Sequence, residues 1–250
     1  MKRALPVFLL SIATYLGVVA SNKAPERADT FDTPLDLAQV NLVEVHSPRN
    51  VEVHFDAKGN ARVTAGNNGR TKIFVNRNGG RLVIQAKVED ADTIKVYLPP
   101  GISRLVVGGR ADVDVAKSMR LPALVIEARG DLQWSGAAES LEIVAPGNAP
   151  GCRKACNCGA DVGVRGPVGR LRVVAMHGDV NLFKPETMGS VDVLLAPPST
   201  VSIHDSRDLG RVRVTDLAGQ PISAAGTAAP AKTTCTAEQD AAAVLRMSDD

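Results

Sequence analysis

Aromatic residues are scarce in this sequence. Tryptophan, tyrosine and phenylalanine together make up 3% of the 250 residues, with a single tryptophan. Base-stacking surfaces and aromatic-lined ligand grooves depend on such rings, so the composition argues against both. The hydrophobic fraction is nonetheless 44%, and the core therefore has to be built from valine, leucine, isoleucine and alanine. These side chains suit short stacked strands, where β-branched residues pack on a pleated surface.

Long apolar runs are absent after the first twenty residues. Residues 1–20 have the pattern of a secretory signal peptide, in which Lys2 and Arg3 precede an apolar run and small residues precede Ser21. An uncleaved membrane anchor is the alternative, but the run is short for a span and polar residues interrupt it. No later segment is apolar enough to cross a bilayer. We therefore expect an exported protein of the periplasm or cell surface, without a membrane span once the signal is removed.

The mature chain also lacks an excess of either charge. Removal of residues 1–20 takes away two cations, which leaves 27 basic and 27 acidic residues. Nucleic-acid binding needs a clear basic excess or a basic patch, so nucleic acid is not expected as a partner.

Catalytic motifs are missing as well. The four histidines, His46, His54, His177 and His204, lie in different segments of the chain. The sequence has no G-x-S-x-G elbow, no H-E-x-x-H pair and no phosphate-binding glycine loop. We therefore predict no catalytic residue, no cofactor and no metal site, and a protein that is not an enzyme.

The sequence does contain a succession of short strands. Residues 21–39 read as a polar leader, and from there to Leu98 apolar and polar residues alternate, as in "NVEVHFD" (50–56) and "RLVIQAK" (81–87). Turn residues separate these segments, and Asn78-Gly79 suits a tight hairpin. A half-buried antiparallel layer is the simplest interpretation of this strand-rich N-terminal portion. The sequence leaves open whether residues 40–100 form a separate layer or the first coils of a solenoid.

Similar segments recur in the second half of the chain. Each opens with an alternating strand, and the starts are 19, 17, 30, 20 and 21 residues apart. The starts are Leu105, Leu124, Leu141, Leu171, Val191 and Val212. Such self-similarity is typical of a solenoid whose units share one core, so the first five of these residues should align in one interior column.

The sequence therefore predicts an all-β fold, a right-handed β-helix-like solenoid of stacked short strands over residues 40–217. The 30-residue interval indicates an insertion of about 13 residues in one turn. The second half of that repeat has the usual length, so the insertion falls at residues 147–159. Beyond the solenoid, residues 218–250 are rich in alanine, glycine, proline and threonine and read as a flexible tail.

Aspartate recurs just before the second strand of several repeats, at Asp112, Asp131, Asp161 and Asp179. A small residue followed by aspartate is typical of turns, because the carboxylate can cap neighbouring amides. One aspartate per repeat offers too few oxygens for calcium. Asp131 also completes Arg129-Gly130-Asp131, the tripeptide of cell-adhesion ligands, but its place in the repeat favours a turn. Trp134, which follows, is expected to cover an end or an edge.

The four cysteines form the remaining candidate site. Cys152, Cys156 and Cys158 lie in the insertion and Cys235 lies in the tail. In an exported protein the even number favours disulfides, with one loop cysteine joined to Cys235 as one plausible pairing. A zinc site, with His177 as a further ligand, and a redox role promoted by the adjacent basic residues are the alternatives.

Several stretches resemble a known family of bacterial secreted proteins, the putative auto-transporter adhesin, head GIN domain family. The resemblance covers about residues 40–215 and rests on "VHSPRNVEVHF" (45–55), "NGGRLVIQAK" (78–87), "IKVYLPPGISRLVVGGRADVDV" (94–115) and "ESLEIVAPGNA" (139–149). The Gly-Ser-Gly-Asp-Val turn pattern of that family is degraded here. The resemblance implies a β-solenoid, export to the envelope and an adhesin-like role.

Three functions stay open on this reading. The first is a non-catalytic exported envelope protein, adhesin-like, whose rigid surface binds another macromolecule, a surface polymer or a protein. The second is a carbohydrate-active enzyme of the polysaccharide lyase or hydrolase type, which would need three or more carboxylate and basic side chains in one groove. The third is a purely structural scaffold.

Overall fold

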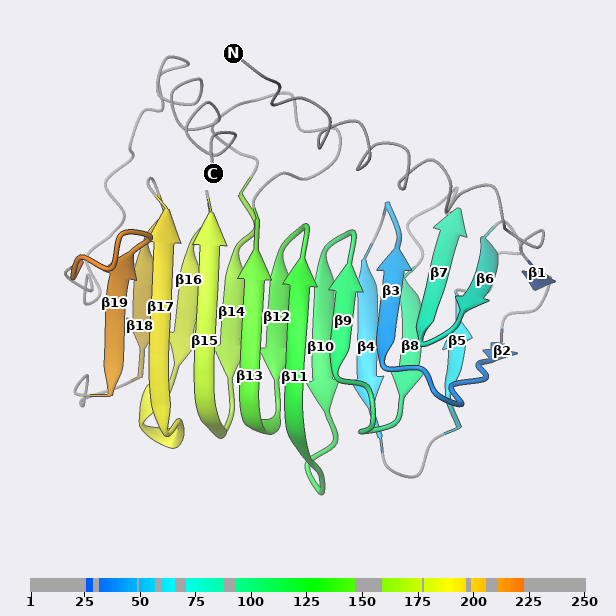
Figure 1. Ribbon diagram of the computed structural model, residues 1–250, viewed down its shortest axis with the longest axis horizontal. Coiled ribbons are helices and arrows are strands. Elements are labelled where there is room, and N and C mark those ends of the chain that lie inside the picture. The colour runs from blue at the N-terminus through cyan, green and yellow to red at the C-terminus, as the bar shows by residue number, and fades with distance from the viewer. Residues whose placement is uncertain are drawn as a thin grey trace, which may run out of the picture.

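The computed structural model describes residues 26–28, 32–48, 50–56, 60–65, 71–87, 93–146, 159–176, 178–196, 199–205 and 211–222. These residues form an all-β fold of two large mixed sheets. Both sheets extend along the long axis of the molecule, and in Figure 1 one lies behind the other. The predicted signal peptide, all four cysteines and His177 lie outside the described residues. No helix in the described part of the chain has the length and hydropathy of a membrane span.

Sheet A has ten strands. In spatial order they are β1 (Glu26–Ala28), β6 (Lys72–Asn78), β7 (Arg81–Lys87), β3 (Leu42–His46), β9 (Arg104–Val107), β11 (Arg120–Ala128), β13 (Ala137–Ala145), β15 (Val168–Met176), β17 (Ser190–Ala196) and β19 (Val212–Asp216). Part of the segment predicted as a polar leader thus contributes a strand at one edge of this sheet.

Sheet B has nine strands. In spatial order they are β18 (Val201–His204), β16 (Val180–Phe183), β14 (Val162–Arg165), β12 (Leu132–Ser135), β10 (Ala111–Val115), β4 (Val51–Phe55), β8 (Ile94–Leu98), β5 (Arg62–Thr64) and β2 (Asp32–Pro34). A short 3₁₀ helix, Pro185–Thr187, follows β16.

From β9 to β19 the chain alternates between the two sheets. Each strand pairs in parallel with the strand two places further along the chain. Corresponding side chains of successive strands therefore lie opposite one another and form columns across the sheet. Leu124, Leu141, Leu171 and Val191 align in one buried column, as their spacing predicts. Leu105 does not join it, because it pairs with Ile126 and therefore lies in the neighbouring column.

The N-terminal portion is not the separate antiparallel layer that its alternation suggested. It is divided between the two sheets, where β3 pairs in parallel with β9 and β4 pairs in parallel with β10. The antiparallel pairs of this portion include β6 with β7 and β5 with β8. The predicted hairpin is present, with Asn78 paired to Arg81 and Gly79 at φ 56° in the turn. Glycine tolerates this left-handed conformation without a Cβ clash.

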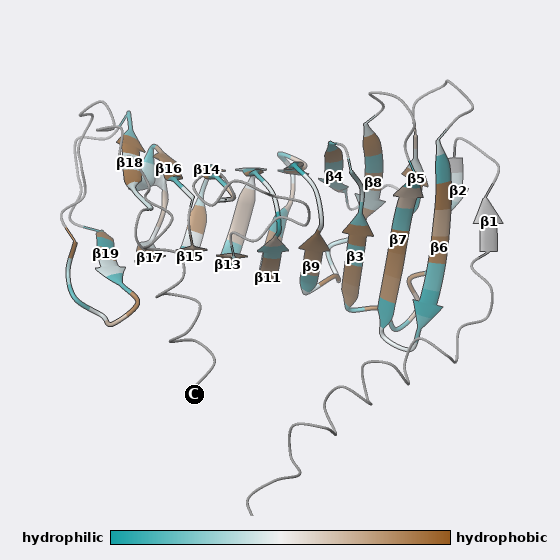
Figure 2. Cartoon of the chain, turned by 90° about the horizontal axis from the view of Figure 1, so that it is seen from above, coloured by the Kyte–Doolittle hydropathy of each residue, from teal (hydrophilic) through white to brown (hydrophobic). Residues whose placement is uncertain are grey.

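The core lies between the sheets and is built almost entirely from aliphatic side chains. Buried residues of both sheets form one cluster, and Figure 2 shows the two layers with apolar residues along their strands. Trp134 belongs to this core, which corrects the prediction that it covers an end or edge. It pairs with Val113 on one side and Val164 on the other, and it is 1% exposed. Its Nε1–H donates to the Gly136 carbonyl at 3.3 Å, so the buried indole retains a polar partner.

Candidate functional site

Three of the predicted aspartates stack at one corner of the molecule. The Oδ1 atom of Asp131 accepts the backbone N–H of Asp161 at 3.1 Å, and that of Asp161 accepts the N–H of Asp179 at 2.9 Å. Asp179 in turn accepts both the N–H and the hydroxyl of Thr200, at 3.1 and 2.7 Å. We name these four residues the corner ladder. Each carboxylate satisfies a backbone donor of the next connection between sheets A and B.

Asp112 lies elsewhere. It is the second residue of β10, where Ala111 pairs with Leu132, so Asp112 lies beyond the corner and opposite Gln133. The strand begins two residues earlier than the turn prediction assumed. The carboxylate is exposed on the outer face of sheet B.

The Arg129-Gly130-Asp131 tripeptide forms the turn between β11 and β12. The Arg129 guanidinium forms an ion pair with Glu127 at 3.0 Å, and Asp131 is the first member of the corner ladder. A Cβ at Gly130 would lie 2.8 Å from the backbone of Gly109, so glycine is required there by close approach. This geometry supports the turn interpretation over an adhesive epitope.

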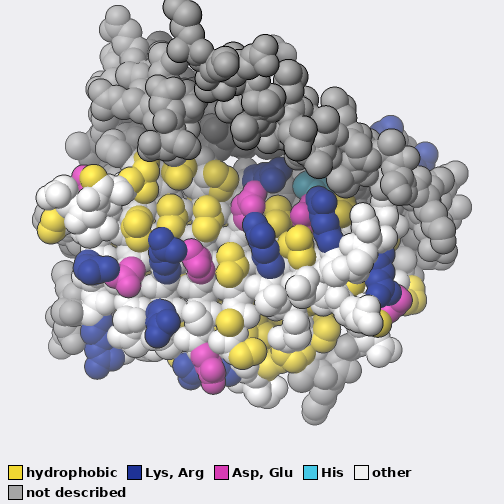
Figure 3. Space-filling view, in the orientation of Figure 1, with side chains coloured by type: hydrophobic (Ala, Val, Ile, Leu, Met, Phe, Trp, Pro, Cys, Tyr) yellow, Lys and Arg dark blue, Asp and Glu magenta, His cyan; other side chains and the backbone are white. Residues whose placement is uncertain are grey.

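The outer face of sheet A carries rows of opposite charges (Figure 3). Glu142 pairs with Arg172 at 2.7 Å and Asp192 pairs with Arg213 at 2.8 Å, in both cases between adjacent strands. These pairs are exposed to solvent, where an ion pair contributes little to stability. Their charges are matched within the face itself.

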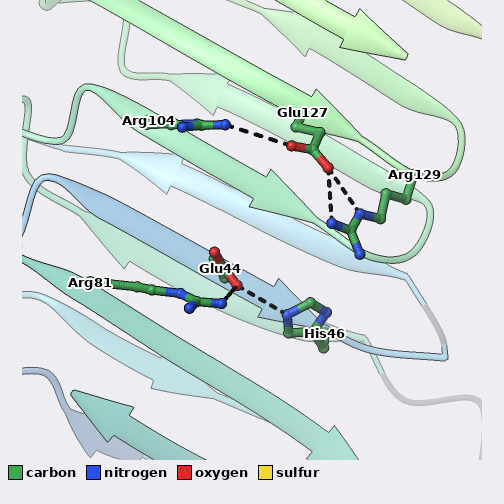
Figure 4. A network of polar contacts seen from close by, with 6 residues as sticks. All are labelled: Glu44, His46, Arg81, Arg104, Glu127 and Arg129. Carbon is green, nitrogen blue, oxygen red and sulfur yellow. Dashed lines mark hydrogen bonds and ion pairs between the residues drawn. The ribbon is translucent and has the colours of Figure 1, made fainter. Parts of the chain in front are cut away.

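Two further ion-pair groups lie at the other end of this face (Figure 4). Glu127 joins Arg104 and Arg129, whereas Glu44 accepts from Arg81 at 2.6 Å and contacts His46 at 3.4 Å. The Glu44 side chain is only 12% exposed. Burial opposes its ionisation, but the hydrogen bonds and charges of Arg81 and His46 outweigh burial and lower the pKa of Glu44.

The outer face of sheet B is different, because aromatic and cationic side chains align on it. In each of eight strands one outward residue lies directly opposite the outward residue of the next. This row, which we name the stacking row, consists of Arg62, Tyr97, His54, Asp114, Ser135, Arg165, Phe183 and His204. Its members alternate along their strands with core residues, so they face away from the core.

Each end of the stacking row is an arginine–aromatic–histidine stack. At one end the Arg62 guanidinium lies 4.4 Å from the centre of the Tyr97 ring, and the His54 ring stacks on Tyr97 with centroids 5.2 Å apart. At the other end Arg165 lies 4.8 Å from the centre of Phe183. The His204 ring stacks on Phe183 at 4.7 Å, with 15° between the ring planes. Cation–π contacts of this kind hold a guanidinium flat on the surface.

A second row runs parallel to the first, two residues nearer the start of each strand. This polar row consists of Lys95, Glu52, Asp112, Gln133, Gly163, Asn181 and Ser202. Gly163 leaves space that the Gln133 side chain fills, since a Cβ there would lie 2.0 Å from Gln133 Oε1. Asn181 Oδ1 lies 3.2 Å from His204 Nε2 and links the two rows.

Charged groups gather where the two rows cross β4, β8 and β10. Glu52 contacts Lys95 at 3.0 Å and His54 at 3.4 Å, and Asp112 and Asp114 lie on the adjacent strand. Burial raises the pKa of Glu52, but the hydrogen bonds and charges of Lys95 and His54 together outweigh burial, and the net pKa is lowered. In the described part of the chain, no group of three or more histidine, cysteine or acidic residues has the geometry to hold a metal ion.

Sequence reasoning did not single out the stacking row. The alternation in "IKVYL" and "VNLF" points Tyr97 and Phe183 outward, but these residues are far apart in the chain. Only the strand order brings their strands into one sheet and one register. His54 and His204, which lie in different segments of the chain, are members of the same row.

Comparison with known proteins gives one family and two solved structures. Residues 41–209 match the sequence profile of a family described as putative auto-transporter adhesin, head GIN domain. A putative adhesin from Bacteroides fragilis NCTC 9343 is 12% identical, with a TM-score of 0.43 over 74% of this chain and 91% of that one. A putative cell adhesion protein from Clostridium sporogenes ATCC 15579 is 6% identical, with a TM-score of 0.28 over 81% and 97%. Among curated proteins, no sequence matches this one.

Proposed function

The chain belongs to the family described as putative auto-transporter adhesin, head GIN domain, and we propose that it is a non-catalytic exported protein that binds an extended macromolecule along the stacking row. The observation that carries this proposal is the alignment of two arginine–aromatic–histidine stacks in one row across sheet B. Family membership fits an exported or cell-surface protein, and we place the protein in the periplasm or on the cell surface.

The fold supports this function because it presents the row on a regular surface. We classify the fold as a β-solenoid, since the chain from β9 to β19 passes between the sheets at every strand and pairs each strand in parallel with the next in its sheet. A solenoid binds through an extended face rather than through a deep pocket. The strands of one sheet are about 4.8 Å apart, so the five strand intervals from Tyr97 to Phe183 span about 24 Å. That length suits a polymer with several units in contact.

An enzyme on the same scaffold is the alternative, and the charged group of Glu52, His54, Lys95, Asp112 and Asp114 is the feature that would favour it. Glycoside hydrolysis requires a carboxylic acid held protonated by a raised pKa. The pKa of Glu52 is shifted in the opposite direction. Asp112 and Asp114 are exposed side chains on an open face. This chemistry argues against glycoside hydrolysis at this group.

Binding of isolated bacterial envelope polymer by the exported protein tests the proposal. The double variant Tyr97→Leu/Phe183→Leu removes the two rings on which the arginine and histidine side chains stack, and Arg172→Gln on sheet A is the matched control. We expect the double variant to lose binding while its circular dichroism and melting temperature stay close to those of the control. Equal binding by both variants would exclude the stacking row. Shortening of the polymer by the wild-type protein, measured as new chain ends, would establish the enzymatic alternative.

A further inference from the structure

We propose that the stack of Arg165, Phe183 and His204 is a subsite for a sugar unit that carries a carboxylate, so that the ligand is an acidic polysaccharide. This inference rests on the proposed function, since it names the chemistry of the polymer that the stacking row binds. It is carried by the contacts around Arg165, by the distribution of charge along the two rows, and by the polar groups beside the ring.

Arg165 differs from the arginines of sheet A. Arg81, Arg172 and Arg213 each pair with a carboxylate of a neighbouring strand. Within the described ranges Arg165 has no ion pair, and its guanidinium lies over the face of Phe183, 4.8 Å from the ring centre. A guanidinium held on a ring in this way keeps its N–H donors at the surface for an incoming anion.

Charge is distributed unevenly along the two rows. The half that lies on β4, β5, β8 and β10 contains Glu52, Asp112 and Asp114. The half on β12, β14, β16 and β18 has no acidic member in either row. Its members are Ser135, Arg165, Phe183, His204, Gln133, Gly163, Asn181 and Ser202. The first half also contains the cations Arg62 and Lys95, so its net formal charge within the two rows is −1, against +1 for the Arg165 half. This difference favours an anionic group at Arg165.

Charged residues lie just beyond both ends of this half. Asp131, Asp161 and Asp179 of the corner ladder precede β12, β14 and β16, two residues before the polar row and on the side away from Arg165. Lys184 and Asp205 follow the ends of β16 and β18, and both are exposed and have left-handed backbone conformations, with φ of 52° and 59°. They carry opposite charges. Arg165 is the cation of this half of the stacking row, as Arg62 is of the other half.

The neighbouring groups match the rest of a sugar unit. The half-buried Phe183 ring lies between the Arg165 guanidinium and the His204 ring, so the stack presents its outer edge to a pyranose rather than a free ring face. Gln133, Asn181 and Ser202 supply amide and hydroxyl groups for sugar hydroxyls. The planar guanidinium can donate two parallel hydrogen bonds to a carboxylate. Ring, hydroxyl and carboxylate occur together in a uronic acid.

Other anionic polymers fit less well. Nucleic acid presents one phosphate per nucleotide and needs several cations along its path, whereas the row supplies Arg165 alone in this half. An acidic peptide could use the guanidinium, but its extended backbone would leave the amide and hydroxyl groups of the polar row without a matching set of hydroxyls. The acidic peptide is therefore a competing outcome of the test below.

The probe is polygalacturonate, with carboxyl-reduced polygalacturonate as the neutral match and polyglutamate as the peptide match. Affinities are measured by titration calorimetry for the full exported protein and for Arg165→Gln, Arg165→Lys and the sheet A control Arg172→Gln. We expect Arg165→Gln to weaken polygalacturonate binding by at least about tenfold, because the variant loses the charge-assisted hydrogen bonds to the carboxylate. The affinity of Arg165→Lys should lie between those of wild type and Arg165→Gln, because lysine keeps the charge but not the planar guanidinium. The control should bind as wild type does, and high salt should weaken wild-type binding.

Each other result overturns the inference. Equal affinity of wild type and Arg165→Gln for polygalacturonate would show that Arg165 does not contact the ligand. Equal affinity of wild type for the acidic and the carboxyl-reduced polymer would show that the carboxylate is not recognised, although the proposed function would stand. Stronger binding of polyglutamate would assign the subsite to an acidic peptide. If wild type binds none of the three probes, the acidic polysaccharide is wrong, and the envelope-polymer experiment decides the proposed function separately.

Discussion

The carboxylate of Asp161 accepts the backbone N–H of Asp179 at 2.9 Å, while its own backbone N–H donates to Asp131. Asp161 is thus held between two other carboxylates in the corner ladder. Burial raises its pKa, the charges of Asp131 and Asp179 act in the same direction, and the hydrogen bond from Asp179 only partly opposes them. The ladder satisfies backbone donors at the cost of bringing like charges together.

This arrangement predicts a stabilising effect of Asp161→Asn at neutral pH. Because the folded-state pKa of Asp161 is raised, its stabilising contribution is full below the ordinary value of 3.8 and is lost as the pH rises through the folded-state pKa. Asparagine keeps the Oδ1 acceptor and carries no charge. The free energy of unfolding of the variant should therefore exceed that of wild type at pH 7, and the difference should shrink towards pH 3. Urea denaturation at several pH values measures it, and a difference that grows on acidification would contradict the prediction.

Glu44→Gln should destabilise the protein by about 1.5 kcal/mol at neutral pH, the low end for a hydrogen bond to a charged group. The pKa of Glu44 is lowered, so its contribution is present above the ordinary value of 4.5 and is lost as the pH falls through the lowered folded-state value. The matched control is Glu142→Gln, whose ion pair with Arg172 is more exposed, at 34% against 12% for Glu44. The control should cost less than about 1 kcal/mol. Equal losses in chemical denaturation would show that burial of Glu44 adds nothing.

Gly178→Ala should destabilise the protein by about 1–3 kcal/mol, the usual range for forced overpacking. A Cβ at this position would lie 2.1 Å from the Ala160 carbonyl oxygen, which belongs to the backbone and cannot turn away. Gly163→Ala is the comparison, because its Cβ would meet the far end of the flexible Gln133 side chain. Its effect should stay within about 0.5 kcal/mol. Thermal melts of the two variants decide the matter, and a larger loss in Gly163→Ala would be inconsistent with the backbone packing described.

Trp134→Ala should cost about 3–5 kcal/mol, as for other large aromatic residues removed from a core. Trp134→Phe should cost less, because most of the contact area with Val113 and Val164 is kept. The single indole also reports its own environment, so wild-type fluorescence should be blue-shifted and should move to longer wavelength on unfolding. Emission at the solvent-exposed wavelength in the folded protein would refute the buried position.

The cysteines lie outside the described residues, and their pairing stays a prediction from the sequence. We expect Cys152, Cys156, Cys158 and Cys235 of the exported protein to form disulfides. Mass spectrometry of the intact protein with and without reductant measures signal removal and the oxidation state of all four thiols together. Four free thiols in the exported protein would be contrary to this expectation.

The sequence predicted the alternating strands and most of their alignment. Leu124, Leu141, Leu171 and Val191 share a column because their spacing follows the strand pairs. Leu105 was assigned two residues out of register, an error that alternation cannot detect, because a shift of two residues leaves every side chain on the same face. The same reasoning applies to β3 and β4, whose alternation is identical in parallel and antiparallel pairing.

The candidate site was less accessible to sequence reasoning. Trp134 could have been placed correctly, since it alternates with Gln133 and shares its face with the buried Leu132. Asp112 was misplaced because "GRAD" resembles "MHGD" in composition, although β10 starts at Ala111 and carries Asp112 to the outer face. The stacking row required knowledge of strand order, because Tyr97 and Phe183 have no relationship in sequence spacing.

The connections between β11 and β12 and between β13 and β14 differ greatly in length. Residues 129–131 form the first connection and residues 146–161 form the second. The pairing of β13 with β15 nevertheless continues the register in which β11 pairs with β13. Chain length at that second connection is therefore uncoupled from the shape of the molecule. It offers a splice point for foreign peptides or whole reporter modules, and evolution could equally have used it to acquire new segments without redesigning the scaffold.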